Sequence, residues 1–158
     1  MVCALRYSFG LALACAAWTC FAQTQTTDGD EVVYAGRIKV SKGEINAKGL
    51  PNGPTRRLQV GDRVRSNEEL STGDQSSMGV TLQDGTLVAL GPKTTLRLDQ
   101  FAYEPRTDAG SMVLSLLKGS MRFVTGAIGK SNRDSIRITT RTATIGIRGT
   151  DFIVEASE

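Results

Sequence analysis

The sequence contains no histidine, and its three cysteines and single tryptophan all lie in the amino-terminal segment, at Cys3, Cys15, Trp18 and Cys20. The rest of the chain therefore offers no disulfide, no cysteine nucleophile, no Ser-His-Asp triad and no histidine-based zinc site. Aromatic residues are also scarce, at 6% of the chain. Because the residue types of the commonest catalytic constellations are missing, we predict a protein that is not an enzyme and that binds no cofactor and no metal ion.

The only long apolar run lies near the amino terminus. Arg6 precedes the apolar residues 11–21, and the small residue Ala22 follows them. The run is shorter than the roughly 20 residues of a membrane-spanning helix, and its order of charge, apolar core and small residue is typical of a secretory signal peptide. We predict that residues 1–22 are a signal peptide cleaved before Gln23, which places the mature protein in the periplasm or outside the cell without a membrane span. An uncleaved anchor is the alternative.

Neither sign of charge is in large excess. Of the charged residues only Arg6 lies in the signal segment, so 18 basic and 16 acidic residues remain, a net charge of +2. This balance gives no electrostatic footprint for nucleic acid, and we predict no such partner. Removing 22 of the 158 residues leaves 136, enough for one domain that buries roughly two-thirds of its unfolded surface. We predict a flexible lead-in at 23–32 and a single domain at 33–158.

The mature chain is rich in Val, Ile, Leu and Thr and contains many glycines. This composition favours short strands joined by tight turns. The pair Asp84-Gly85 lies between two apolar runs and predicts a β-hairpin. Leucines at 58, 70 and 82 and glycines at 61, 73 and 85 recur with a period of 12 residues. This spacing is typical of a roll or sandwich, or of a short β-solenoid. We predict an all-β fold of one of these kinds, with no amphipathic helix.

The second half of the chain gives more specific expectations. Strands are predicted at 111–117 and 120–124, on either side of a turn at Lys118-Gly119. Polar residues predict surface loops at 103–110 and 126–134.

The stretch 142–154 predicts two short strands hinged at Gly149. Ile145 and Ile147 alternate with polar or small residues before this glycine, and a second alternation follows it. Glycine tolerates the positive φ that a tight reversal needs, and Asp151 is placed to hydrogen-bond back onto the turn. We therefore expect this pair to close a small β domain.

Five turn motifs occur in a characteristic order: Val60-Gly61-Asp62, Thr72-Gly73-Asp74, Asp84-Gly85-Thr86, Lys118-Gly119 and Arg148-Gly149-Thr150-Asp151-Phe152. In this order and spacing the chain resembles the FecR domain family, from about Tyr34 to Val154. The resemblance implies an exported all-β domain of roll or solenoid-like character. In the iron-siderophore regulators of this family, the domain lies in the periplasm and relays a signal from an outer-membrane transporter to a cytoplasmic sigma factor. The shared motifs are structural turns, so the resemblance supplies no catalytic residues.

The chain departs from those regulators at both ends. They carry a cytoplasmic anti-sigma segment and a retained membrane helix before the domain, whereas here a predicted signal peptide precedes it. Similar domains usually continue with more strands after the Gly-Thr-Asp-Phe turn, whereas this chain stops at Glu158. We therefore expect that carboxyl-terminal strands are missing or that a partner completes the edge, and we do not carry over the sigma-regulator role.

The aspartates beside the glycines have two interpretations. A calcium site needs six or more oxygens that converge on one point, but these aspartates are 10 to 12 residues apart and none belongs to a D-x-D cluster. Aspartate beside glycine is ordinary turn chemistry, which we favour. We assign structural turn roles to Gly61, Asp62, Gly73, Asp74, Asp84, Gly85, Gly119, Gly149, Thr150 and Asp151.

Basic residues gather in the carboxyl-terminal third. Alternation with Ile136 and Ile138 points Arg137 outward. Such a stripe suits an acidic partner, such as a glycan, a lipid headgroup or a protein. It also suits a strand edge that is kept charged against strand addition, which is the commoner role. We name Arg137, Arg141 and Arg148 as the candidate binding residues.

The acidic residues show no catalytic pairing. Glycoside hydrolysis needs two carboxyl groups that face each other across a cleft, and nothing in the sequence pairs Glu44, Glu68, Glu69 or Glu104. We predict that these four side chains are solvated.

Two functional hypotheses remain. The first is an exported, non-enzymatic protein-interaction or signalling module of the cell envelope, whose exposed strand edges bind a partner by strand addition. The alternative is a module that binds polysaccharide or peptidoglycan. An exposed aromatic platform would favour the alternative, and only Phe101 and Tyr103 lie close together in the sequence. The expected partner is thus an envelope protein or an acidic glycan.

Overall fold

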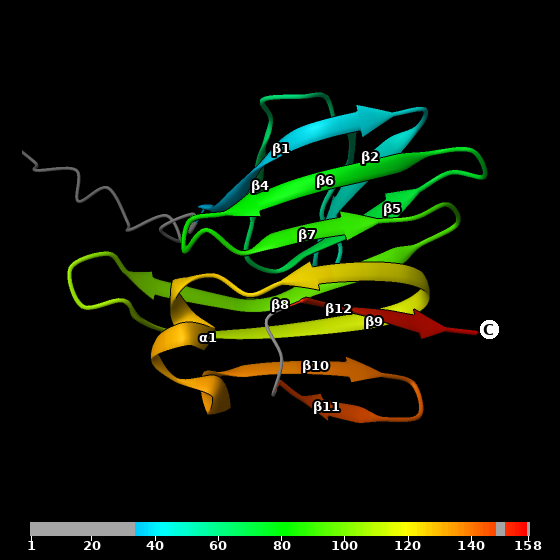
Figure 1. The fold of residues 1–158 in the computed structure, drawn as a ribbon. Helices are drawn as coiled ribbons and strands as arrows, with labels where there is room; N and C mark the ends of the chain where they lie inside the picture. The colour runs from blue at the N-terminus through cyan, green and yellow to red at the C-terminus, as the bar shows by residue number, and fades with distance from the viewer. Residues whose placement is uncertain (1–33, 148–150, 158) are drawn as a thin grey trace, which may run out of the picture. The chain divides into compact units, whose positions relative to one another are not determined.

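Strands make up most of the part of the chain that the computed structural model describes, residues 34–147 and 151–157 (Figure 1). The predicted all-β fold class is therefore confirmed. The strands are β1 (Tyr34–Lys42), β2 (Ile45–Gly49), β3 (Thr55–Arg57), β4 (Arg63–Arg65), β5 (Glu68–Thr72), β6 (Ser77–Leu82), β7 (Leu87–Leu90), β8 (Thr95–Glu104), β9 (Ala109–Val124), β10 (Ile136–Thr140), β11 (Thr144–Gly146) and β12 (Asp151–Ala156).

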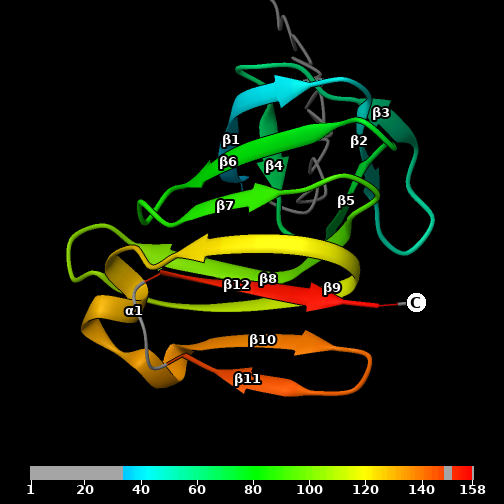
Figure 2. The same ribbon diagram turned by 45° about the vertical axis from the view of Figure 1, so that its right-hand side comes forward.

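The strands form one continuous sheet that curls over on itself (Figures 1 and 2). β8 and β10 flank the first part of the central strand β9, and β7 and β12 flank its last part. We call the half made of β4, β1, β6, β7, the end of β9 and β12 sheet A. The half made of β3, β2, β5, β8, the start of β9, β10 and β11 is sheet B. Among the described strands only β9 and β10 pair in parallel, which fits a roll rather than the stacked parallel coils of a β-helix.

The sheet curls over within β9 (Figure 1), where the pairing of β9 changes from β8 at Lys118 to β12 at Gly119. The sequence predicted two strands separated by a turn at Lys118-Gly119, whereas the structure keeps both segments in one strand of 16 residues. Gly119 has φ of +88°, and a Cβ there would lie 2.3 Å from Thr94 Oγ1 and 2.6 Å from Thr94 Cα. Because glycine supplies both the backbone angle and the space, β9 passes from sheet B to sheet A without ending.

The core lies between the two sheets and follows the period-two alternation of each strand. In β6, Met78, Val80 and Leu82 are buried, and the residues between them are half-buried. Val80 and Leu82 of sheet A line one small void of about 10 Å³ together with Leu96 and Leu114 of sheet B. The inward side chains of both sheets therefore form a single core.

The hairpin predicted at Asp84-Gly85 is confirmed. β6 and β7 pair antiparallel on either side of it, and Gly85 has φ of +79°. The leucines of the 12-residue period, Leu58, Leu70 and Leu82, are all buried. The period thus marks points at which the chain returns to the core.

The two strands predicted in 142–154 exist, but they do not pair with each other. β11 pairs with β10 in sheet B, whereas β12 pairs with β9 in sheet A. Asp151 is the first residue of β12, and its carboxylate accepts hydrogen bonds from Arg122 of β9. Gly149 and Thr150, which we assigned to the turn, lie outside the described residues.

Both predicted loops contain more regular structure than expected. The loop at 126–134 holds a short helix, α1 (Ala127–Ser131), and a 3₁₀ turn at Arg133–Ser135. Ile128 of α1 is buried in the core, but five residues are too few to show helical periodicity in the sequence. The loop at 103–110 shrinks to four residues because β8 and β9 extend into it. Neither helical segment in the described ranges has the length and hydropathy of a membrane span.

Candidate binding surfaces

Arg137 and Arg141 are exposed but do not line the same hollow. Arg137 lies on β10 between buried Ile136 and Ile138, facing outward as the alternation predicted. Arg141 lies in the link from β10 to β11 and lines an open hollow of about 580 Å³ with Lys118 of β9. Arg137 does not line this hollow, and Arg148 lies outside the described residues. Their role in binding stays a prediction.

The residues assigned to turns play different parts. Gly61 and Gly85 have φ of +96° and +79°. Asp62 Oδ2 accepts a 2.8 Å hydrogen bond from the backbone amide three residues earlier. The Gly73 carbonyl accepts bonds from two backbone amides, and Asp74 is exposed, 3.8 Å from a lysine ammonium. These contacts hold the corners of the sheet in place and offer no convergent oxygens.

Asp84 differs from these aspartates because it is buried. Its Oδ1 accepts a 3.0 Å bond from the Thr86 amide, and its Oδ2 accepts a 2.6 Å bond from Thr86 Oγ1. The same Oγ1 accepts a 3.0 Å bond from the Gly126 amide, and the Asp84 carbonyl accepts a 2.7 Å bond from the Ala127 amide. A Cβ on Gly126 would lie 2.3 Å from the Thr86 nitrogen, so glycine permits this approach. We call these four residues the buried node, since they join the β6–β7 turn to the start of α1.

Glu68 is not solvated, contrary to the prediction. Its side chain is buried and accepts bonds of 3.0 and 2.9 Å from Arg56 Nη2. The Arg65 amide adds a 2.9 Å bond to Oε2. The prediction failed because Arg56 lies 12 residues away in the chain and reaches Glu68 only through the folding of β3 and β4. The other three predicted acids are exposed or half-buried. Glu68, the buried one of the four, therefore stabilises the fold through its bonds to Arg56 and Arg65.

Exposed hydrophobic side chains lie on the outer face of sheet A, on both sides of Arg122. Across the strands Val40 lies opposite Gly79, Gly79 opposite Ala89, Ala89 opposite Arg122 and Arg122 opposite Ile153. Leu87 lies on the same face, two residues from Ala89. The exposed fractions of Val40, Leu87 and Ile153 are 58%, 47% and 67%. Three of the four large exposed hydrophobic side chains of the described chain therefore share one face, which we call the apolar face (Val40, Leu87, Ala89, Ile153).

β12 forms one edge of this face. Among the described residues it pairs only with β9, so its other side has no strand partner. An open edge with an exposed hydrophobic side chain is the usual receptor for an added strand. The sequence did not single out Ile153, because alternation alone does not tell which side of the last strand faces the core.

An ion pair holds β12 at its first residue. Arg122 donates to Asp151 through Nε (3.0 Å) and Nη2 (2.6 Å). Hydrogen bonding by the guanidinium holds the pKa of Asp151 below its ordinary value of 3.8, and the carboxylate raises the pKa of Arg122. The pair is exposed, so salt weakens it.

We expect β12 to loosen at low pH. The folded-state pKa of Asp151 is depressed, so the contribution of the pair is complete at neutral pH and is lost as the pH falls below about 4. Amide exchange of β12, corrected for intrinsic rates, should become faster at pH 3 than at pH 6 in the wild type. In Asp151→Asn it should change much less. Equal changes in both proteins would contradict a role for this pair.

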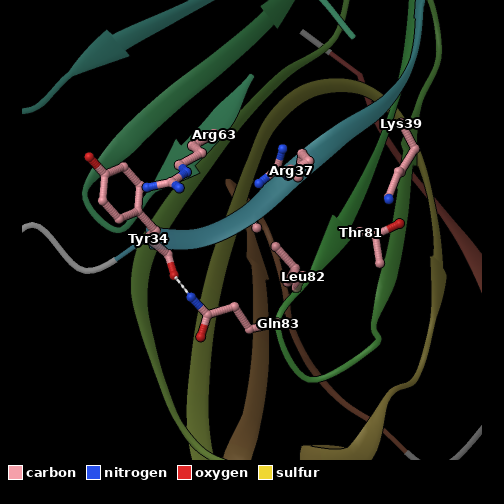
Figure 3. Close-up of a pocket in the computed structure, with 8 residues that line it drawn as sticks. Tyr34, Arg37, Lys39, Arg63, Thr81, Leu82 and Gln83 are labelled. Carbon is pink, nitrogen blue, oxygen red and sulfur yellow. Dashed lines mark hydrogen bonds between the residues drawn. The ribbon is translucent and has the colours of Figure 1, made fainter. Parts of the chain in front are cut away.

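A basic groove lies at the opposite end of sheet A (Figure 3). β1, β4 and the end of β6 enclose an open volume of about 460 Å³, whose polar lining includes Arg37, Lys39, Arg63 and Gln83. The Arg63 guanidinium lies 4.7 Å from the centre of the Tyr34 ring. The Gln83 side-chain amide donates to the Tyr34 carbonyl. We call this site the basic groove.

The described residues show no metal-binding cluster of three or more acidic, cysteine or histidine side chains. The basic groove presents cations and an amide, and the apolar face presents hydrocarbon.

Comparison with known proteins identifies the family. The model of the family described as FecR protein matches residues 68–158, from β5 to beyond β12, which is more than half of the chain. No curated protein and no solved structure gives a significant match. The matched range contains the Asp84-Gly85-Thr86 turn of the buried node, the curl at Gly119 and the edge strand β12. The chain belongs to the FecR family.

Proposed function

We propose that this protein is an exported, non-enzymatic FecR module that binds an extended segment of an envelope protein at the β12 edge. FecR domains occur in regulators of envelope signalling, so an interaction role fits the family. The signal-peptide pattern of residues 1–22 supports export. The scarcity of catalytic residue types supports a non-enzymatic role.

The observation that carries the proposal is the apolar face beside an open edge. A strand added to β12 would gain main-chain hydrogen bonds along the edge, and its side chains would pack beside Ile153. Ile153 lies opposite Arg122 and is 67% exposed, so the partner would bury hydrocarbon that water now covers. Patches of this kind commonly mark protein interaction sites. Strand addition also gives a reason for an exposed hydrophobic residue on an edge that could otherwise be charged.

The glycan-binding alternative has less support. Phe101 is only 4% exposed, and the Tyr103 hydroxyl donates a 2.7 Å bond to Asp108. These two aromatic residues therefore do not form the exposed platform on which a sugar would stack.

The test is a capture experiment from solubilised cell envelope with the affinity tag inserted after Gln23, away from β12 in the sequence. Ile153→Asp should reduce capture of the partner at least about tenfold, because one charge enters a buried contact. Val60→Asp is the matched control: Val60 is 62% exposed but lies in the link between β3 and β4, outside the apolar face. It should leave capture unchanged.

Equal loss of capture in the two variants, with both melting like the wild type, would contradict the β12 site. Co-sedimentation with purified sacculi, without capture of a protein, would instead favour the glycan alternative. A partner lost only in Ile153→Asp would support the proposal.

A further inference from the structure

We propose that the basic groove binds a phosphate-type oxyanion, either a free phosphate or the phosphate of an anionic lipid headgroup. This inference is independent of the β12 site, because β4 and β12 lie at opposite ends of sheet A. It rests on charge, geometry and volume.

The groove concentrates positive charge without internal compensation. Arg37, Lys39 and Arg63 all line it, and no acidic residue does. In the described part of the chain none of the three forms an ion pair. Like charges placed directly across neighbouring strands destabilise a sheet, yet Arg37 lies opposite Arg63 in the pairing of β1 with β4. An anion bound between them would remove this repulsion.

Tyr34 orients the arginines. The Cζ atoms of Arg63 and Arg65 lie 4.7 and 5.7 Å from the centre of its ring. A guanidinium stacked on an aromatic ring keeps its N–H donors free at the edge of its plane. Figure 3 shows the Arg63 guanidinium beside the Tyr34 ring, with Gln83 bound to the Tyr34 carbonyl. The groove therefore holds part of its donor set in place before a ligand arrives, which lowers the entropic cost of binding.

Phosphate fits this donor set better than a single carboxylate. Guanidinium groups donate two parallel N–H bonds to phosphate, and a lysine ammonium adds a point charge. One carboxylate would neutralise one of the three lining cations, whereas a phosphate monoester carries up to two negative charges and three terminal oxygens. The volume of about 460 Å³ also falls within the range of small-ligand sites.

The experiment titrates the purified protein with inorganic phosphate and follows amide chemical shifts. We expect saturable shifts at Arg37, Arg63 and Gln83, which weaken as ionic strength rises. In the double variant Arg37→Glu/Arg63→Glu, the apparent affinity should fall at least about tenfold. Arg106→Glu/Arg133→Glu is the matched control, since it makes the same change of charge at exposed arginines that do not line the groove, and it should bind as the wild type does. Arg37→Gln, which adds no negative charge, should give an intermediate loss.

A second arm separates the sources of phosphate. Flotation with phosphatidylcholine vesicles, with and without phosphatidic acid, whose headgroup is a phosphate monoester, reports binding to a headgroup. Phosphate binding without flotation supports a soluble ligand, and flotation lost only in the groove variant supports a lipid. If the groove and control variants lose binding equally, the effect is one of net charge and the proposal is wrong. It is also wrong if neither phosphate nor vesicles bind.

Discussion

Replacing Phe123 with alanine is expected to lower the free energy of unfolding by about 3–5 kcal/mol. Phe123 is fully buried at the end of β9, and its ring stacks on Phe152 with centroids 5.3 Å apart. It pairs with Val88 of β7 on one side and with Phe152 of β12 on the other. The substitution therefore removes a large core side chain and the aromatic contact that anchors β12.

The expected result has a second part, which tests this link. Phe123→Ala should increase amide exchange in β12 more than in β6, because β12 has only β9 as a strand partner among the described residues. Phe101→Ala is the matched control. Phe101 is also buried but lies on β8 in sheet B, so its loss should destabilise the domain without selectively freeing β12. Denaturant melts with hydrogen exchange measure both effects, and equal β12 exchange at equal stability would contradict the anchoring role.

Local turn chemistry was the most reliable guide to the fold. Asp84-Gly85 predicted the β6–β7 hairpin because a short turn and its flanking apolar runs depend on nearby residues only. Gly119 was correctly marked as a special position, but the sequence did not show that β9 continues through it. Continuity depends on Thr94, 25 residues earlier, which packs against the glycine.

The short strands were hidden for a related reason. β3 and β4 are three residues each, and each contains two arginines. The one buried residue in these two strands is Val64 of β4. Such segments have no apolar run, so their pairing with β2 and β1 comes from long-range contacts. The basic groove could not be predicted without β4, because Arg63 reaches it only through the pairing of β4 with β1.

The apolar face was missed because its residues do not contrast with their neighbours. In β7, Leu87, Val88, Ala89 and Leu90 are all apolar, yet only alternate members are buried. Period-two reasoning assigns faces when polar and apolar residues alternate, as they do around Arg137. Where both faces are apolar, only the packing of the two sheets decides which one is left for a partner.

Thr86→Val tests how much the buried node contributes to stability. The node contains two residues of the Asp84-Gly85-Thr86 motif, and both are buried. Valine keeps the shape of threonine but removes the hydroxyl that donates to Asp84 and accepts from Gly126. Two buried polar groups would lose a partner, each at a cost of about 1–3 kcal/mol, so we expect a loss of about 2–6 kcal/mol. Thr95→Val is the matched control, because Thr95 is half-buried on the outer face of sheet B, and it should change stability by less than about 0.5 kcal/mol.

The double variant Asp84→Ala/Thr86→Val distinguishes a network from two separate contacts. If the carboxylate and the hydroxyl act together, the two substitutions should be far from additive, since each single change already removes the 2.6 Å bond between them. Additive losses in thermal or denaturant melts would show that Thr86 acts mainly through Gly126. In either case Asp84 bonds Thr86 through its carboxylate and Ala127 through its carbonyl, so its role in this turn is to join the β6–β7 hairpin to the start of α1.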